Sequence, residues 1–104
     1  MLHLMGRSFM QIRLNRKTKE NYTAAMVENL PQLRGILGIT QAQLAERVGI
    51  TRQTLTSIEN HSRKLTWKGY LALCFVFSLN REAREWMEMQ DICPEIIVNY
   101  LKAE

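Results

Sequence analysis

The sequence has few cysteines and no cluster of metal-ligating side chains. Its two cysteines, Cys74 and Cys93, form no Cys-x-x-Cys pair and have no histidine beside them, which excludes the usual structural zinc sites. Cys74 lies in an apolar run, where a free thiol behaves as a small hydrophobic side chain. We therefore expect a reduced, cytoplasmic protein with no metal and no other cofactor.

Long apolar stretches are missing as well. The longest, Leu71–Phe77, is far shorter than the roughly 18–20 residues that a membrane-spanning helix needs. The N-terminus has neither a long hydrophobic segment nor a small-residue cleavage site, so we expect no signal peptide and no membrane partner. With two prolines and 46% hydrophobic residues in 104, the chain is expected to fold as one domain with short extensions.

The net charge of +4 is distributed unevenly along the chain. Residues 1–23 carry five basic side chains and one acidic side chain. Residues 24–66 carry five basic and three acidic side chains, and residues 67–104 carry four basic and six acidic side chains. The basic end is suited to an anionic partner, although a solubilising surface explains the charge equally well.

Hydrophobic periodicity predicts a helix from Asn21. Its apolar face has four members at spacings of three and four: Met26, Leu30, Leu33 and Leu37. Pro31 removes one backbone donor, so we expect a kink or a break near Asn29–Leu30, and Gly38 is suited to end the helix. Residues 1–20 are predicted as a basic, flexible arm, with a short strand possible at Phe9–Leu14.

Shorter helices follow, each after a residue that favours a helix N-cap. They are predicted at Gln41–Arg47 after Thr40, Arg52–Glu59 after Thr51, Trp67–Phe77 after Thr66 and Arg81–Met89 after Asn80. Pro94 opens a last helix through Leu101, although Glu95–Leu101 is β-branched enough for a strand. We expect residues 21–79 to form one domain and residues 80–104 a helical extension.

The segment Thr40–Asn60 has the spacing of two short helices joined by a tight turn. Such a turn imposes a wide crossing angle between the two helices. The small side chain of Ala45 allows the helices to approach closely, and Gly49 can adopt the positive φ that the turn needs. The residues predicted to point inward are Leu44, Val48, Ile50, Leu55 and Ile58. The second helix then presents only hydrogen-bonding side chains outward, namely Arg52, Gln53, Thr56 and Ser57. A helix of this kind fits the major groove of DNA.

This stretch resembles the Cro/lambda-repressor (Xre) type of helix-turn-helix, over about Leu30–Phe77. The matching residues are Leu33-Arg34, Gly38–Gln41, Leu44–Glu46, Val48–Leu55 and Ile58–Asn60. The resemblance implies an all-α bundle of four to five helices, with residues 51–59 as the recognition helix in the major groove. His61 stands where many relatives have glycine, so it needs a left-handed or adjusted backbone.

The resemblance also assigns roles to individual side chains. Arg52, Gln53 and Ser57 match base-contacting positions, and Thr56 lies on the same outward face. The resemblance implies phosphate contacts from Gln41, Thr51, Thr54 and Asn60. Arg63 and Lys64, in the loop that follows, are interpreted either as further phosphate contacts or as plain loop charges. Arg34 and Glu59 match a pair that is often salt-bridged in this family and serve the scaffold.

The remaining aromatic residues are expected to be structural. Trp67, Tyr70, Phe75 and Phe77 are assigned to the core, because they lie on a helix and not on a sheet that stacks bases. Three further side chains, Trp86, Met87 and Met89, are interpreted either as core or as an exposed dimer surface.

The sequence thus predicts a small transcriptional regulator, most simply a repressor, that binds specific double-stranded DNA as a homodimer. Dimerisation is assigned to the helices after Phe77. Two alternatives stay open: an antitoxin that also binds a toxin protein, and a protein-interaction adaptor that does not touch DNA. An enzyme is the least favoured class, because Ser57 and His61 have no acid placed to complete a triad.

Overall fold

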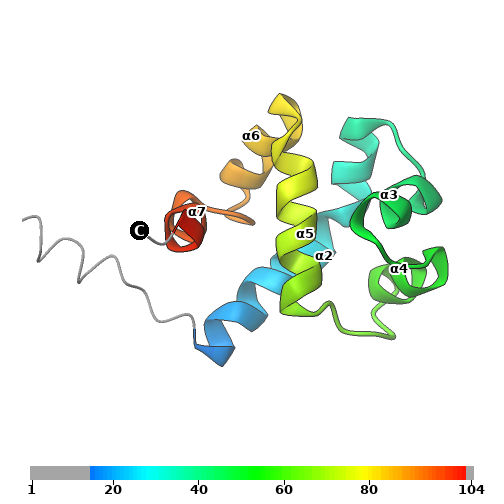
Figure 1. Cartoon of the computed structure of the whole chain (residues 1–104), viewed down its shortest axis with the longest axis horizontal. Helices are drawn as coiled ribbons and strands as arrows, with labels where there is room; N and C mark the ends of the chain where they lie inside the picture. Colours follow the sequence, from blue (N-terminus) through cyan, green and yellow to red (C-terminus); the bar gives the residue numbers. More distant parts are fainter. Residues whose placement is uncertain (1–14, 103–104) are drawn as a thin grey trace, which may run out of the picture.

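The computed structural model describes residues 15–102, except for the side chains at positions 95, 96, 98 and 100. Within this range every regular element is an α-helix, which confirms the predicted all-α class. The helices in Figure 1 are α2 Arg16–Leu37, α3 Gln41–Val48, α4 Arg52–Glu59, α5 Trp67–Ser78, α6 Arg81–Met89 and α7 Glu95–Lys102. The strand predicted for Phe9–Leu14 lies outside the described residues. The strand alternative for Glu95–Leu101 is wrong, because α7 occupies that segment.

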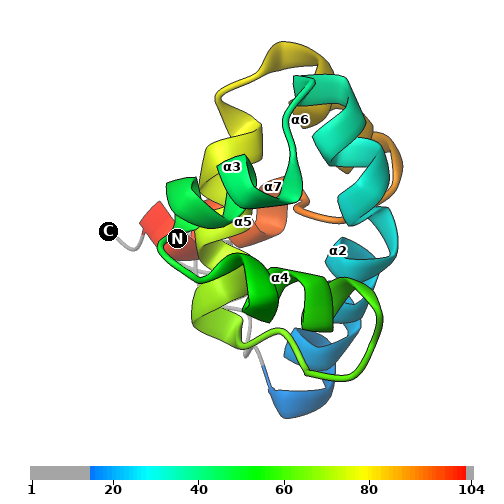
Figure 2. The same cartoon turned by 90° about the vertical axis from the view of Figure 1, so that its right-hand side faces the viewer.

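Helix α2 begins before its apolar periodicity does. Asn15 caps it by accepting a hydrogen bond from the Thr18 amide at 2.8 Å, so residues 16–20 of the predicted arm are helical and the predicted start at Asn21 is too late. The helix runs through Pro31 without a break. Figures 1 and 2 show its axis bending between the blue and teal parts, as expected where proline removes a backbone donor.

The caps predicted for α3 to α6 are all present. In each, the side chain accepts a hydrogen bond from the backbone amide three residues later; these caps are Thr40, Thr51, Thr66 and Asn80. The Thr40 amide also donates to the Gln43 side chain at 2.9 Å, which completes a capping box. Gly38 and Gly49 end α2 and α3 with φ of 68° and 78°, a region that glycine enters without steric cost.

One hydrophobic core receives side chains from every described helix, and α5 packs there against α2, α3 and α6. Tyr70 and Phe77 of α5 are fully buried, as predicted, and Trp67 is half-buried and stacks on Tyr70 with 4.7 Å between ring centroids. The core prediction is wrong for Phe75, which is 66% exposed. The three packed helices cover the other faces of α5 and leave the face that carries Phe75 open.

The segment predicted as an extension, 80–104, closes the same core within its described part. Its buried members are Ala83, Met87, Ile92 and Ile97. Trp86 of α6 is half-buried and donates from Nε1 to Asn29 Oδ1 of α2 at 3.0 Å, whereas Met89 is 71% exposed. Helices α6 and α7 therefore both contribute side chains to the core that the preceding helices form.

Candidate nucleic-acid interface

Helices α3 and α4 lie together on one side of the molecule, which faces the viewer in Figure 2. Between them, the Ile50 amide donates to the Ala45 carbonyl at 3.0 Å, across the left-handed Gly49. Ala45 is buried, so its small side chain lets the two helices approach. Of the predicted inward residues, Leu44, Leu55 and Ile58 are buried, and Val48 and Ile50 are half-buried. The local geometry is that of a helix-turn-helix.

The outward face of α4 is polar and carries no acid. Arg52 and Gln53, in the first turn, are exposed, and Ser57 is half-buried. Glu59 is the one acid in α4, and its side chain is turned inward and only 9% exposed. Positive charge and hydrogen-bonding groups are therefore displayed without a neighbouring negative charge on the same helix.

Glu59 is held by a bidentate ion pair that joins α4 to α2. Arg34 donates from Nε to Oε2 at 2.9 Å and from Nη2 to Oε1 at 3.1 Å. This confirms the pair that the family resemblance implied. Because the fork-shaped guanidinium fixes both oxygens of the carboxylate, the pair sets the position of the last turn of α4 against α2.

The ion pair extends into a hydrogen-bond network that joins α3 to α4. Gln41 donates from Nε2 to Glu59 Oε1 at 3.0 Å, and its Oε1 accepts from the Thr56 hydroxyl at 2.8 Å. Two residues predicted to meet DNA, Gln41 and Thr56, are thus bonded to each other. The amide group of Gln41 retains one N–H, whereas Thr56 directs its proton toward α3. Sequence reasoning missed this network, because no short-range spacing links its members.

The hydroxyl groups at the start of α4 are also engaged. Thr51 accepts from the Thr54 amide at 3.0 Å and donates its own proton to Thr54 Oγ1 at 2.9 Å. At the other end of α4, Asn60 Oδ1 accepts from the Ser62 amide at 3.1 Å and from its hydroxyl at 2.7 Å. These bonds fix both ends of α4, so that its outward face is held in one orientation.

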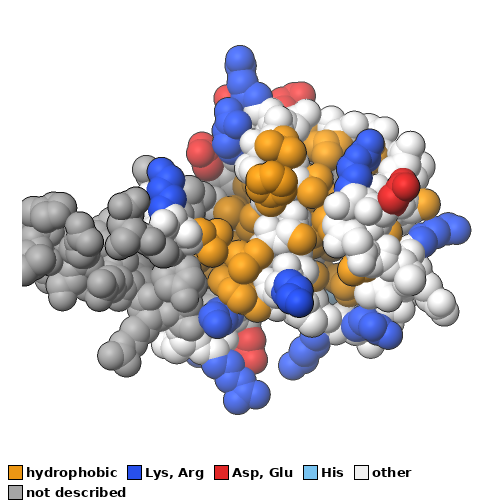
Figure 3. Space-filling view, in the orientation of Figure 1, with side chains coloured by type: hydrophobic (Ala, Val, Ile, Leu, Met, Phe, Trp, Pro, Cys, Tyr) orange, Lys and Arg blue, Asp and Glu red, His pale blue; other side chains and the backbone are white. Residues whose placement is uncertain are grey.

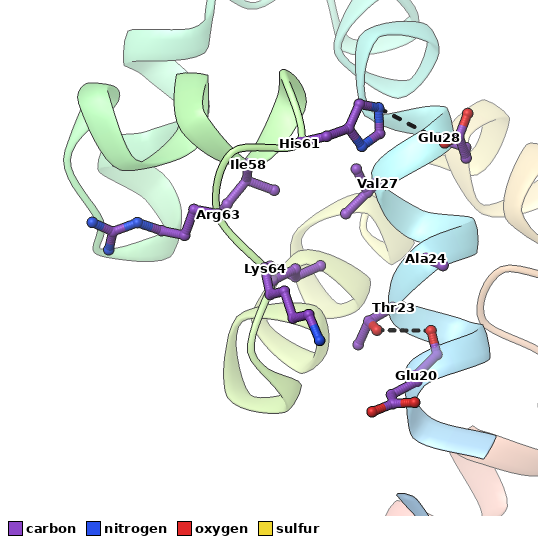
Figure 4. Close-up of a pocket in the computed structure, with 10 residues that line it drawn as sticks. Glu20, Thr23, Ala24, Val27, Glu28, Ile58, His61, Arg63 and Lys64 are labelled. Atoms are coloured by element: carbon purple, nitrogen blue, oxygen red, sulfur yellow. Dashed lines mark hydrogen bonds and ion pairs between the residues drawn. The ribbon is translucent and has the colours of Figure 1, made fainter. Parts of the chain in front are cut away.

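The loop after α4 carries His61 and two cationic side chains, Arg63 and Lys64. His61 adopts φ 68°, the left-handed backbone expected of it, and Figure 4 shows its ring directed toward Glu28 of α2, with 3.9 Å between Nε2 and Oε2. Arg63 and Lys64 are exposed along the rim of a groove of about 340 Å³ between α2 and the loop. In Figure 4 the Arg63 side chain extends away from α2.

Residues 15–102 were also searched for metal sites and for membrane-spanning helices. No three His, Cys, Asp or Glu side chains in this range come close enough together to hold a metal ion. None of the helices in the described range combines the length and apolar character needed to cross a membrane.

A short helix with an exposed basic and polar face, fixed against a second helix by a tight turn, defines a helix-turn-helix domain of DNA-binding proteins. Comparisons with known proteins agree. A family model described as helix-turn-helix matches residues 32–66. The chain is 33% identical over 66 residues to a protein of Bacillus subtilis (strain 168) named uncharacterized HTH-type transcriptional regulator YgzD, a match that spans 64% of this chain and all of the relative. No solved structure matched the chain.

The chain therefore belongs to the helix-turn-helix family of the Cro/lambda-repressor (Xre) type, a family of DNA-binding regulators and not of enzymes.

Proposed function

We propose that this protein acts in the cytoplasm as a transcriptional repressor that reads specific duplex DNA with α4 in the major groove. The observation that carries the proposal is the outward face of α4, where Arg52 and Gln53 are exposed and the helix's one acid is turned inward. The same face argues against the adaptor alternative, which calls for an apolar or acidic surface at this position.

Base recognition is assigned to the first two turns of α4. Arg52 has the fork geometry for guanine O6 and N7, and the Gln53 amide matches adenine N6 and N7. Ser57 is available for a shorter contact one turn later. Thr56 is a weaker candidate, because its hydroxyl proton is donated to Gln41. Each bidentate contact is worth about 1–3 kcal/mol of discrimination between bases.

Phosphate binding is assigned to side chains around this face. They are Gln41 through its remaining N–H, Thr51, Thr54, Asn60, Arg63 and Lys64. Helices α3 and α4 support the assignment, since neither has an acid in its first turn and both are capped by a neutral threonine. The N-terminal amides of such helices attract phosphate, and no acidic residue of the first turn opposes them.

Selection of bound fragments from a random duplex pool tests sequence-specific binding. We expect one motif to be enriched, and Arg52→Ala to weaken binding to it by about 5- to 150-fold, the equivalent of about 1–3 kcal/mol. Arg81→Ala is the control, because it also removes an exposed positive charge, but from α6 and away from α4. If Arg52→Ala weakens binding to random DNA by the same factor, Arg52 contacts phosphate and not a base. A pool in which no motif is enriched contradicts specific recognition.

We further propose a homodimer on a pseudo-palindromic site, with half-sites about one helical turn apart. Support comes from the exposed apolar side chains, which are Phe75, Leu79, Met89 and Leu101. Figure 3 shows apolar side chains gathered over α5. Dimerisation was assigned by sequence to the helices after Phe77, and Phe75 extends that surface onto α5.

Point variants test the dimer better than truncation, because Ile92 and Ile97 lie in the core. Sedimentation of Leu79→Glu and Met89→Glu should give a lower mass than the wild type at the same concentration. Gln90→Glu is the control, because it adds a negative charge at the exposed residue next to Met89 without removing an apolar side chain. An unchanged mass in both apolar variants places the interface elsewhere. Co-purification with a second protein through this surface supports the antitoxin alternative instead.

A further inference from the structure

A groove separates α4 from the first half of α5. Helix α4 packs against α2 and α3, and toward α5 it leaves a cavity of about 620 Å³, bordered by the α3–α4 turn and by the loop after α4. Gly69, in the first turn of α5, adds no side chain to this space, where a Cβ would lie 2.9 Å from Leu65 Cδ1. The volume of this α4–α5 groove falls within the roughly 300–1,000 Å³ of sites that hold small organic molecules.

The inner wall of the α4–α5 groove is apolar. It is formed by buried and half-buried side chains from α3, α4, α5 and the two connecting segments, namely Val48, Ile50, Ile58, Leu65 and Leu73. Hydrocarbon that enters the groove leaves water and gains contact with these side chains, so its binding is favoured. The wall therefore selects a ligand with an apolar body.

The rim of the same groove is cationic and carries hydroxyl groups. Arg63, which extends away from α2 in Figure 4, and Lys64 are both exposed lining residues. Thr54 accepts the hydroxyl proton of Thr51 at 2.9 Å, and its own proton is not used in that bond. None of the described residues that line the groove is acidic. The rim therefore attracts a negatively charged head group.

We infer that the α4–α5 groove is an effector site for a small amphipathic anion, an aliphatic carboxylate. Its chain lies on the apolar wall, and its head group meets Arg63 and Lys64. The effect on DNA rests on the proposed function, which assigns four of the lining residues to phosphate: Thr51, Thr54, Arg63 and Lys64. A carboxylate held there occupies the same donors and adds negative charge beside the duplex. Ligand and DNA should therefore weaken each other's binding by the same factor.

Octanoate, added to the full-length chain without DNA and followed by amide NMR, tests the site itself. We expect the Gly49 and Gly69 amides to shift, while Gly35, an exposed glycine of α2 that does not line the groove, stays in place. 1-Octanol has the same chain without the charge, and acetate has the head group without the chain, so each should bind more weakly. Shifts confined to the surroundings of Phe75 and Leu79 overturn the proposal, as does equal binding of octanoate and 1-octanol.

The double variant Arg63→Gln with Lys64→Gln tests the head-group contact. It should weaken octanoate binding by about 2- to 20-fold, the effect of losing two exposed ion pairs, and leave 1-octanol binding unchanged. Lys68→Gln is the matched control, because it removes an exposed lysine of α5 that does not line the groove. Circular dichroism checks that each variant keeps its helices. Wild-type affinity for octanoate in the double variant, or an equal loss in Lys68→Gln, overturns the proposal.

Binding of the selected duplex in the presence of octanoate tests the effector role. Saturating octanoate should lower the affinity for the duplex, whereas acetate at the same concentration controls for ionic strength. If octanoate occupies the groove and the duplex binds as before, the effector role is overturned and the proposed DNA binding stands. If the chain binds no duplex, the proposed function fails, and the octanoate titration still decides whether the groove is a ligand site.

Discussion

The substitution Glu59→Ala probes the junction that holds α4 in place. The Glu59 carboxylate accepts two hydrogen bonds from Arg34 and one from Gln41, all between 2.9 and 3.1 Å. The Arg34 side chain is 20% exposed and that of Glu59 is 9% exposed. Removing the carboxylate therefore leaves a largely desolvated guanidinium and an amide N–H without partners, and desolvation of the charged partner is the main cost.

The expected loss follows from these contacts. A hydrogen bond to a charged group contributes about 1.5–3 kcal/mol, and breaking a buried ion pair on one side costs about 3–5 kcal/mol. Because Arg34 keeps some access to water, we expect Glu59→Ala to lower the free energy of unfolding by about 2–4 kcal/mol. In a domain of this size that corresponds to a fall in Tm of roughly 10–25 °C.

Urea unfolding followed by circular dichroism measures this loss. Glu46→Ala is the matched control, because Glu46 is an exposed acid on α3, and its loss should stay within about 0.5 kcal/mol. The double variant Arg34→Met with Glu59→Met should recover much of the stability, since an apolar pair carries no desolvated charge. If Glu59→Ala behaves like Glu46→Ala, the ion pair contributes no more than a surface pair and the reasoning is refuted.

Three further substitutions test other parts of the structure. His61→Gly should raise the free energy of unfolding by about 0.5–1 kcal/mol in urea, because glycine adopts φ 68° without strain; a loss would show that the His61 side chain matters more than its backbone. Tyr70→Phe should lower it by about 1–2 kcal/mol, because the Ile92 carbonyl loses its donor, and an unchanged midpoint would contradict that bond. Gln41→Ala should weaken binding to selected and random duplexes by the same factor, whereas a shift in the enriched motif would make Gln41 a base contact.

The parts of the fold that depend on local sequence signals could be predicted well. Threonine and asparagine caps, glycines at helix ends and the period of the apolar residues act over a few positions, so α3 to α6 were placed to within a residue. The start of α2 was missed because residues 16–20 are polar and show no apolar period, although Asn15 is itself a good cap. The effect of Pro31 was open because neighbouring contacts decide whether a proline bends or breaks a helix.

Long-range contacts were the part that could not be predicted. An apolar helix such as α5 shows no preferred face, so its sequence did not reveal that Phe75 is exposed while Tyr70 and Phe77 are buried. The exposed positions Arg52 and Gln53 followed from the spacing of α4. The bonds of Gln41 to Thr56 and Glu59 did not, because they join residues on different helices. Of these contacts between helices, the family resemblance implied the Arg34–Glu59 pair.

An amide NMR titration with the selected duplex tests most directly whether α4 is the surface that meets DNA. The chain of 12.2 kDa suits this method. Residues 52–57 and the start of α3 should show the largest shift changes on adding the selected duplex, and those in α4 should differ when the duplex sequence is scrambled. Changes confined to α5–α7, with α4 unmoved by the selected duplex, would contradict the account.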